Sequence, residues 1–118
     1  MYFFLSAYNI CSWSGLTESC GGCFTSIGDV FSMIGTVGVP ITTIEARLES
    51  VPEMGYDALA SMPRGEICLR GTTLFSGYHK RQDLTEDVLV DGWFHTGKTL
   101  LVQCIDKQLH SKAVFVTG

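Results

Sequence analysis

The sequence predicts an α/β fold in which strands outnumber helices. Residues 44–49 alternate strictly between apolar and charged side chains, as a strand with one buried face requires. Residues 65–71 form a short apolar run bracketed by glycines, which predicts a second strand. A short helix is expected to begin at Asp83, three residues before Glu86 in a capping-box-like pattern, and to end near Leu89.

The remaining elements are predicted from apolar runs and turn-forming residues. Within 44–49 we expect Ile44, Ala46 and Leu48 to face the core, with the charged side chains on the opposite face. The other expected elements, in chain order, are a buried strand within 1–11, a glycine-rich loop at 35–40, a connection at 51–64, a turn at 76–78, a tight turn at 91–92, and strands at 100–105 and 113–116.

Composition bounds the size and the partners of the protein. At 118 residues the chain is one domain at most. Hydrophobic residues make up 46% and charged residues 17%, whereas about 25% of a typical soluble domain is charged. This balance predicts a part of a larger protein, whose other parts cover the surplus apolar surface. The formal net charge of −4 provides no attraction for nucleic acid, so no nucleic-acid partner is expected.

The cysteines and the N-terminal run bear on the compartment. Five irregularly spaced cysteines are an odd number, which argues against a secreted disulfide framework and predicts an intracellular, reducing environment. The N-terminal run has no preceding basic residue and no small-x-small cleavage site, so a signal peptide is not expected. A transmembrane segment is not expected either, because no stretch reaches about 20 apolar residues.

The run 13–23 contains several side chains that could bind a ligand or a metal ion. Thr17 and Glu18 place a hydroxyl beside a carboxylate, and flanking glycines allow the backbone to approach a ligand closely. Such a pair suits a metal-bound phosphate. The same pattern also marks an ordinary helix start, in which Thr17 is the cap and Glu18 an exposed acid of the first turn. From these residues alone, both interpretations stay open.

Three other motifs favour structural explanations. Residues 92–99 match the phosphate-loop pattern, but bulky Trp, Phe and His fill positions where small residues are favoured, so we reject that function. Cys20 and Cys23 have the spacing of a redox pair or half a zinc site, but no second pair matches them, and we expect buried structural thiols. His79 and His95 lack a partner acid at a recognisable spacing and are expected to be structural or half-exposed.

Five segments, at 15–19, 35–40, 65–71, 76–78 and 92–97, resemble in order and spacing consecutive core motifs of the adenylate-forming enzymes. The resemblance is greatest to plant-type long-chain acyl-CoA synthetases, for which residues 47–58 and 71–81 look characteristic. It implies an incomplete fragment of the large N-terminal domain, mainly its β-rich subdomain. Residues 15–97 are then a partial AMP-binding (adenylation) domain, between a divergent N-terminal segment at 1–14 and a divergent C-terminal tail at 98–118.

The resemblance implies a long-chain fatty acid–CoA ligase that uses ATP, Mg²⁺ and CoA. In that reaction a fatty acid is joined to AMP with release of pyrophosphate, and the CoA thiol then displaces AMP to give acyl-CoA. Carried over by position, Thr17 would hydrogen-bond phosphate, and Glu18 would hold the Mg²⁺. Gly15 and Leu16 would line the adenine and acyl-carboxylate site. The implied location is intracellular, at the surface of the endoplasmic reticulum or another organelle membrane.

Two positions depart from the family pattern. Ser14 stands where the family places an aromatic ring that stacks on adenine. Lys98 stands where the family has an aspartate that accepts both ribose hydroxyls, and lysine can only donate. The upstream phosphate loop and the C-terminal domain with its catalytic lysine find no match, so we expect the isolated chain not to form acyl-adenylate. Two alternatives stay open: a non-catalytic fragment that docks on a full-length relative, and a small redox or zinc protein that uses Cys20 and Cys23.

Overall fold

The computed structural model describes residues 2–6, 9–26, 37–104 and 112–116, with side chains from 15 to 26 and from 37 to 102. Within these residues the chain forms two antiparallel sheets. The first has the order β1 (Tyr2–Ser6), β2 (Asn9–Leu16), β3 (Gly21–Thr25), β4 (Val39–Pro40). The second has the order β5 (Ile44–Glu49), β6 (Arg64–Gly71), β8 (Trp93–Cys104), β7 (Leu89–Val90), and β9 (Lys112–Val116) also pairs with β8.

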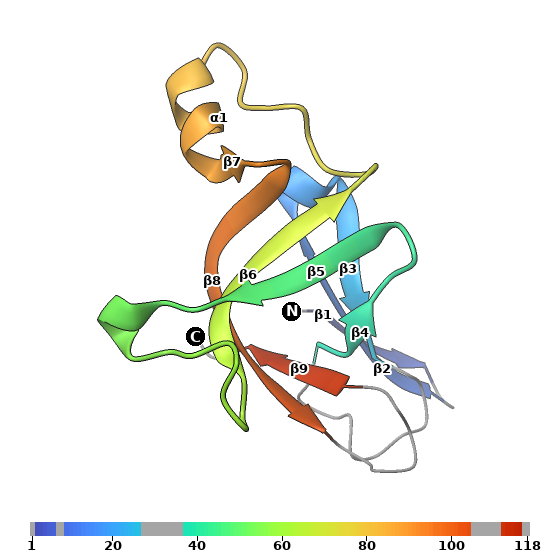
Figure 1. Ribbon diagram of the computed structural model, residues 1–118. Coiled ribbons are helices and arrows are strands. Elements are labelled where there is room, and N and C mark those ends of the chain that lie inside the picture. Colours follow the sequence, from blue (N-terminus) through green and yellow to red (C-terminus); the bar gives the residue numbers. More distant parts are fainter. Residues whose placement is uncertain (1, 7–8, 27–36, 105–111, 117–118) are drawn as a thin grey trace.

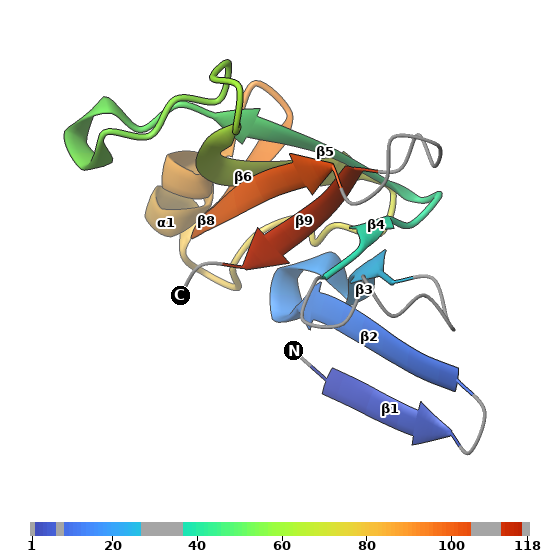
Figure 2. The same cartoon turned by 90° about the horizontal axis from the view of Figure 1, so that it is seen from below.

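Short helical segments connect the strands. The 3₁₀ turn η1 (Thr17–Ser19) joins β2 to β3, η3 (Pro52–Met54) lies in the connection after β5, and α1 (Gln82–Val88) precedes β7. Figure 1 shows α1 and β7 at one end of the five-stranded sheet. Figure 2 shows the β1–β2 hairpin on the side of the molecule away from that sheet.

The core lies between the two sheets. The alternation in β5 is confirmed, because Ile44 is buried and Ala46 and Leu48 pack against the core, while Glu45 and Arg47 are exposed. The buried members of the core cluster come from both sheets and the segment before β4, and they are Cys23, Phe24, Val37, Ile44, Ile67, Leu69 and Leu100. The opposite face of β5, β6 and β8 carries charged side chains together with Trp93 and the buried Cys68.

The mainly β architecture is confirmed, and several element boundaries are corrected. The apolar N-terminal run is not one strand, because β1 and β2 pair as a hairpin. The strand expected at 100–105 is the second half of β8, which begins at Trp93 and pairs with both β6 and β9. A phosphate loop at 92–99 is thereby excluded, since seven of these residues lie in a strand. Of the loop predicted at 35–40, positions 35 and 36 fall outside the described residues.

The start of α1 differs from the expected capping box. Its N-cap is Arg81, without a side-chain capping bond, and Asp83 instead forms an ion pair with Arg81 in the first turn. Thr85 organises this end of the helix: its hydroxyl donates to the Arg81 carbonyl at 2.9 Å and accepts the Tyr78 N–H at 2.9 Å. The helix start is therefore set by a contact with the preceding turn, which a local sequence pattern does not reveal.

Candidate functional site

An open cleft of about 410 Å³ brings together segments that are far apart in the sequence. One wall is the end of β2 with η1, and the other is the first half of β8. All four predicted site residues line it: Gly15 and Thr17 are exposed, and Leu16 and Glu18 are half-buried. The remaining lining residues are Tyr78, Val88, Phe94, His95, Thr96 and Lys98.

The Thr17–Ser19 turn is shaped by Ser19, which the sequence reasoning missed. Its side chain is 1% exposed, and its hydroxyl accepts the Leu16 N–H at 3.1 Å. The same hydroxyl can donate to the carbonyl of Leu16 at 2.8 Å or of Gly21 at 2.7 Å. Thr17 is not the helix cap of the simpler interpretation, because Leu16 occupies the N-cap and Thr17 is the first residue of the turn. The Thr17 hydroxyl thus stands at the cleft without a capping role.

Gly15 is required by the packing of the backbone. A Cβ at this position would lie 2.2 Å from the carbonyl oxygen of Gly21 on the neighbouring strand, far inside normal contact distance. The register of β2 and β3 also shifts between Ser14 and Gly15, so the bulge turns the chain toward η1. Gly15 was expected to let the backbone approach a ligand, and close packing against β3 is a second reason for glycine at this position. The side chain of Ser14 lies outside the described residues.

Glu18 is held by the turn that contains Tyr78. The Tyr78 hydroxyl donates to Glu18 Oε1 at 2.9 Å across 60 residues of sequence, and the Phe75 N–H donates to the Glu18 carbonyl at 2.7 Å. The hydrogen bond to Glu18, together with some burial and the carboxylate charge, raises the pKa of Tyr78 above its usual value of 10. A carboxylate has further lone pairs on its second oxygen, so this contact orients Glu18 and leaves it able to bind a cation.

The opposite wall is fixed by the hairpin that begins β8. Asp91 and Gly92 both have positive φ, 51° and 77°, as a two-residue type I′ hairpin requires. The tight turn predicted there is confirmed. Beyond it, the Thr96 hydroxyl donates to the Ile67 carbonyl at 2.8 Å, and the Lys98 N–H donates to Thr96 Oγ1 at 3.2 Å. Lys98 is exposed at the cleft, where it brings a cation opposite the carboxylate-bearing wall.

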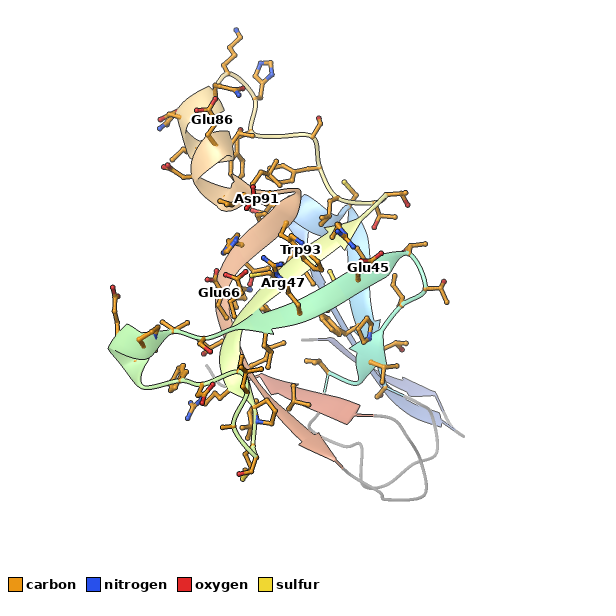
Figure 3. The ribbon with its side chains drawn as sticks, viewed as in Figure 1. Glu45, Arg47, Glu66, Glu86, Asp91 and Trp93 are labelled. Carbon is orange, nitrogen blue, oxygen red and sulfur yellow. The ribbon has the colours of Figure 1, made fainter. Side chains whose placement is uncertain are left out.

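The first half of β8 also contributes to the polar face of the second sheet, which it forms together with β5 and β6. Figure 3 labels Glu45, Arg47, Glu66 and Trp93 on these three strands. Trp93 on β8 lies beneath two guanidinium groups, with Arg47 Cζ at 4.3 Å and Arg70 Cζ at 4.6 Å from its ring centroid. Arg70 also forms an ion pair with Glu45. His95, next but one to Trp93, is half-buried, as expected, and it has two carboxylates within 4 Å that its sequence spacing did not reveal. His79 is exposed, whereas a structural or half-exposed histidine was expected.

The thiols of Cys20 and Cys23 lie in different environments. Both are free, but Cys23 is 1% exposed in the core and Cys20 is exposed to solvent at the end of η1. The expectation of buried thiols is therefore correct for Cys23 and wrong for Cys20. One thiol in the core and one in solvent give no geometric support to a paired redox or zinc site.

Comparison with known protein families matches residues 3–79 to the family described as AMP-binding enzyme. The chain belongs to the AMP-binding enzyme family. It is 87% identical over 83 residues to a probable CoA ligase, CCL6, of Humulus lupulus, a match that covers 70% of this chain and 13% of that protein. It is 70% identical over 94 residues to long chain acyl-CoA synthetase 2 of Arabidopsis thaliana, covering 79% and 14% respectively. The resemblance found from the motifs is thereby confirmed, and the chain spans about one seventh of these relatives' length.

Solved structures of AMP-binding enzymes share the fold. The adenylation domain of a carboxylate reductase from Mycobacterium chelonae is 30% identical with a TM-score of 0.65, and the match covers 87% of this chain and 14% of that one. Unliganded O-succinylbenzoate CoA synthetase from Bacillus subtilis is 24% identical with a TM-score of 0.72, covering 94% and 22%. Both are adenylate-forming folds of which this chain represents a mainly β part. In the described part of the chain, no helix has the length and apolar character needed to cross a membrane.

Proposed function

We propose that the chain is part of the adenylation domain of a long-chain acyl-CoA synthetase, an AMP-forming fatty acid–CoA ligase. The observation that carries this proposal is the cleft, in which the Thr17–Glu18 wall faces the Thr96–Lys98 wall. The two walls carry the first and the last of the five segments that resemble adenylate-forming enzymes. The chain is also 70% and 71% identical to two plant long chain acyl-CoA synthetases over the matched residues. The implied substrates are a long-chain fatty acid, ATP and CoA.

The residues of the first wall fit a Mg²⁺–nucleotide complex. Glu18 offers a carboxylate oriented by Tyr78, which suits a hard cation such as Mg²⁺. Thr17 offers an exposed hydroxyl that can donate to a phosphate oxygen, and Gly15 and Leu16 form the adjoining surface for adenine and the acyl carboxylate. When bound, Mg²⁺ would neutralise negative charge on the phosphate oxygens.

Lys98 limits what this chain does with that complex. Its ammonium group attracts phosphate, but it has no lone pair to accept hydrogen bonds from the two ribose hydroxyls. The nucleotide is therefore held without a fixed ribose, and we propose that the isolated chain binds Mg²⁺–ATP weakly and does not form acyl-adenylate.

Binding and exchange measurements on the purified chain test this proposal. Titration with ATP is expected to depend on Mg²⁺, and Glu18→Gln is expected to remove that dependence. The matched control is Glu86→Gln on α1, away from the cleft, which should bind as the unchanged chain does (Figure 3). Lys98→Asp restores an acceptor and should tighten AMP binding by about tenfold, the effect of one hydrogen bond to a charged group. Mg²⁺-independent binding, or equal effects of the two glutamine variants, would contradict the assignment.

Activity is measured separately with palmitate as the substrate. ATP–pyrophosphate exchange is expected to stay at background for the unchanged chain, because adenylate formation needs an ordered ribose and phosphate. Clear turnover would show that Lys98 does not impair the reaction.

The second candidate function is a non-catalytic fragment that docks on a full-length relative. Exposed apolar side chains on the connection between β5 and β6 favour it: Met54 is 54%, Leu59 93% and Met62 57% exposed. Co-purification with an intact acyl-CoA synthetase, lost in Leu59→Asp but not in the exposed-site control Ser61→Asp, would support it. Location at an organelle membrane surface remains a prediction.

A further inference from the structure

Three residues that commonly bind metals converge on the polar face of the second sheet. Glu49 lies on β5, Cys68 on β6 and His95 on β8, and the strand register places Cys68 directly opposite His95. One ligand atom from each residue lies within 4.8 Å of the others. The neighbouring strand pair brings Glu66 opposite Glu49, so a second carboxylate adjoins the group. Neither nucleotide binding at the cleft nor docking on a relative uses this arrangement.

The distances around the His95 ring fit ligands that share one ion. His95 Nδ1 lies 3.6 Å from Cys68 Sγ, 3.5 Å from Glu66 Oε2 and 3.9 Å from Glu49 Oε2. The two carboxylate oxygens lie farther from the ring nitrogen than the roughly 2.7–3.2 Å of a good N–H···O hydrogen bond, whereas the sulfur distance also fits a hydrogen bond between the thiol and the ring. In a tetrahedral zinc site, with Zn–S of about 2.3 Å and Zn–N of about 2.0 Å, sulfur and nitrogen are about 3.5 Å apart.

Both carboxylates are oriented by contacts on their outer oxygens. Glu49 Oε1 forms an ion pair with Arg47, which leaves Oε2 directed at the His95 ring. Glu66 Oε1 accepts the Gly97 N–H at 2.8 Å, which leaves its Oε2 directed at the same ring. Metal sites use such outer contacts to fix their ligands, so the carboxylates are arranged before any ion arrives.

The electrostatics of the group favour a cation. Cys68 is 0% exposed, and burial, followed by the charges of Glu49 and Glu66, raises the pKa of its thiol to about 11 against the opposing influence of Arg47. A thiophilic cation bound here would offset the repulsion between the two carboxylates and a thiolate ligand.

We propose that Glu49, Cys68 and His95 bind a thiophilic divalent cation, represented by Zn²⁺, with Glu66 or water as the fourth ligand. The mixed sulfur, nitrogen and oxygen set suits Zn²⁺ and does not suit Mg²⁺, which prefers oxygen ligands alone. The ion joins three adjacent strands and therefore stabilises the sheet that forms one wall of the cleft. This site is separate in its chemistry from the Mg²⁺ position proposed at Glu18.

Cobalt substitution tests the site without any assumption about activity. The metal-free chain is titrated with Co²⁺, and a thiolate-to-cobalt charge-transfer band should grow to one equivalent and disappear when Zn²⁺ is added. Cys68→Ser should abolish the band, and Glu49→Gln should weaken Zn²⁺ binding by at least about tenfold. The control is Cys20→Ser, which changes an exposed thiol at the C-cap of η1 and should leave the band intact.

Several outcomes would overturn the proposal. They are the absence of a charge-transfer band in the unchanged chain, a band that persists in Cys68→Ser, and a band lost in Cys20→Ser. Circular dichroism of the metal-free proteins checks that each variant is folded. Because Glu49 is partly exposed and glutamine has the same shape, Glu49→Gln provides a test even where Cys68→Ser fails to fold.

Discussion

Ser19→Ala is the substitution with the best-defined cost at the cleft. It removes a hydroxyl that accepts one backbone N–H and donates to a backbone carbonyl, at a position where the side chain is 1% exposed. Removing one partner of this hydrogen bond and leaving the Leu16 N–H unpaired costs about 1–3 kcal/mol. We therefore expect the free energy of unfolding to fall by about 1–3 kcal/mol, a large share of the total for a domain of this size.

Urea unfolding followed by tryptophan fluorescence measures this cost. The matched control is Ser76→Ala, where the serine is exposed and the expected change is within about 0.5 kcal/mol. The midpoint for Ser19→Ala should move to lower urea with an unchanged slope. Equal stability of the two variants would refute the claim that Ser19 holds the Thr17–Ser19 turn.

Three further predictions concern the backbone, the tyrosine contact and the core. Gly15→Ala should destabilise the chain by about 1–3 kcal/mol in urea unfolding, because the added Cβ clashes with the neighbouring strand. In the control Gly92→Ala the Cβ meets open space, so the cost should be only the roughly 1 kcal/mol of placing alanine in a left-handed backbone conformation. Because Glu18 raises the pKa of Tyr78, Glu18→Gln should lower the Tyr78 pKa toward 10 in a tyrosinate absorbance titration. In the unchanged chain, the stability that Tyr78 contributes should be present below pH 10 and lost as the pH rises through its raised pKa. Leu69→Ala should cost about 2–5 kcal/mol in thermal unfolding, and an unchanged midpoint would contradict the placement of the core.

The elements predicted correctly are those with a strong local signal. Strict alternation at 44–49 identified β5 and its buried face, and Asp91–Gly92 identified the hairpin turn. Only the second half of the twelve-residue β8 was predicted as a strand, because its first half is aromatic, polar and glycine-containing. Pairing with neighbouring strands extends it, and that pairing is a tertiary effect.

In the candidate site, too, residues with a local sequence signal were predicted and contacts between distant segments were not. Thr17 and Glu18 were identified from a motif, whereas the Tyr78 contact joins positions 60 residues apart and has no local signature. The grouping of Cys68 with His95 depends on the register of separate strands, which the sequence alone does not specify.

The most direct test of the proposed function is an amide NMR titration of the 118-residue chain with Mg²⁺–ATP. If the cleft holds the nucleotide, chemical-shift changes should be concentrated at Gly15–Glu18 and Thr96–Lys98, and Glu18→Gln should abolish the Mg²⁺-dependent part. Absence of shift changes, or changes centred on the connection after β5, would contradict the assignment of this cleft to the nucleotide.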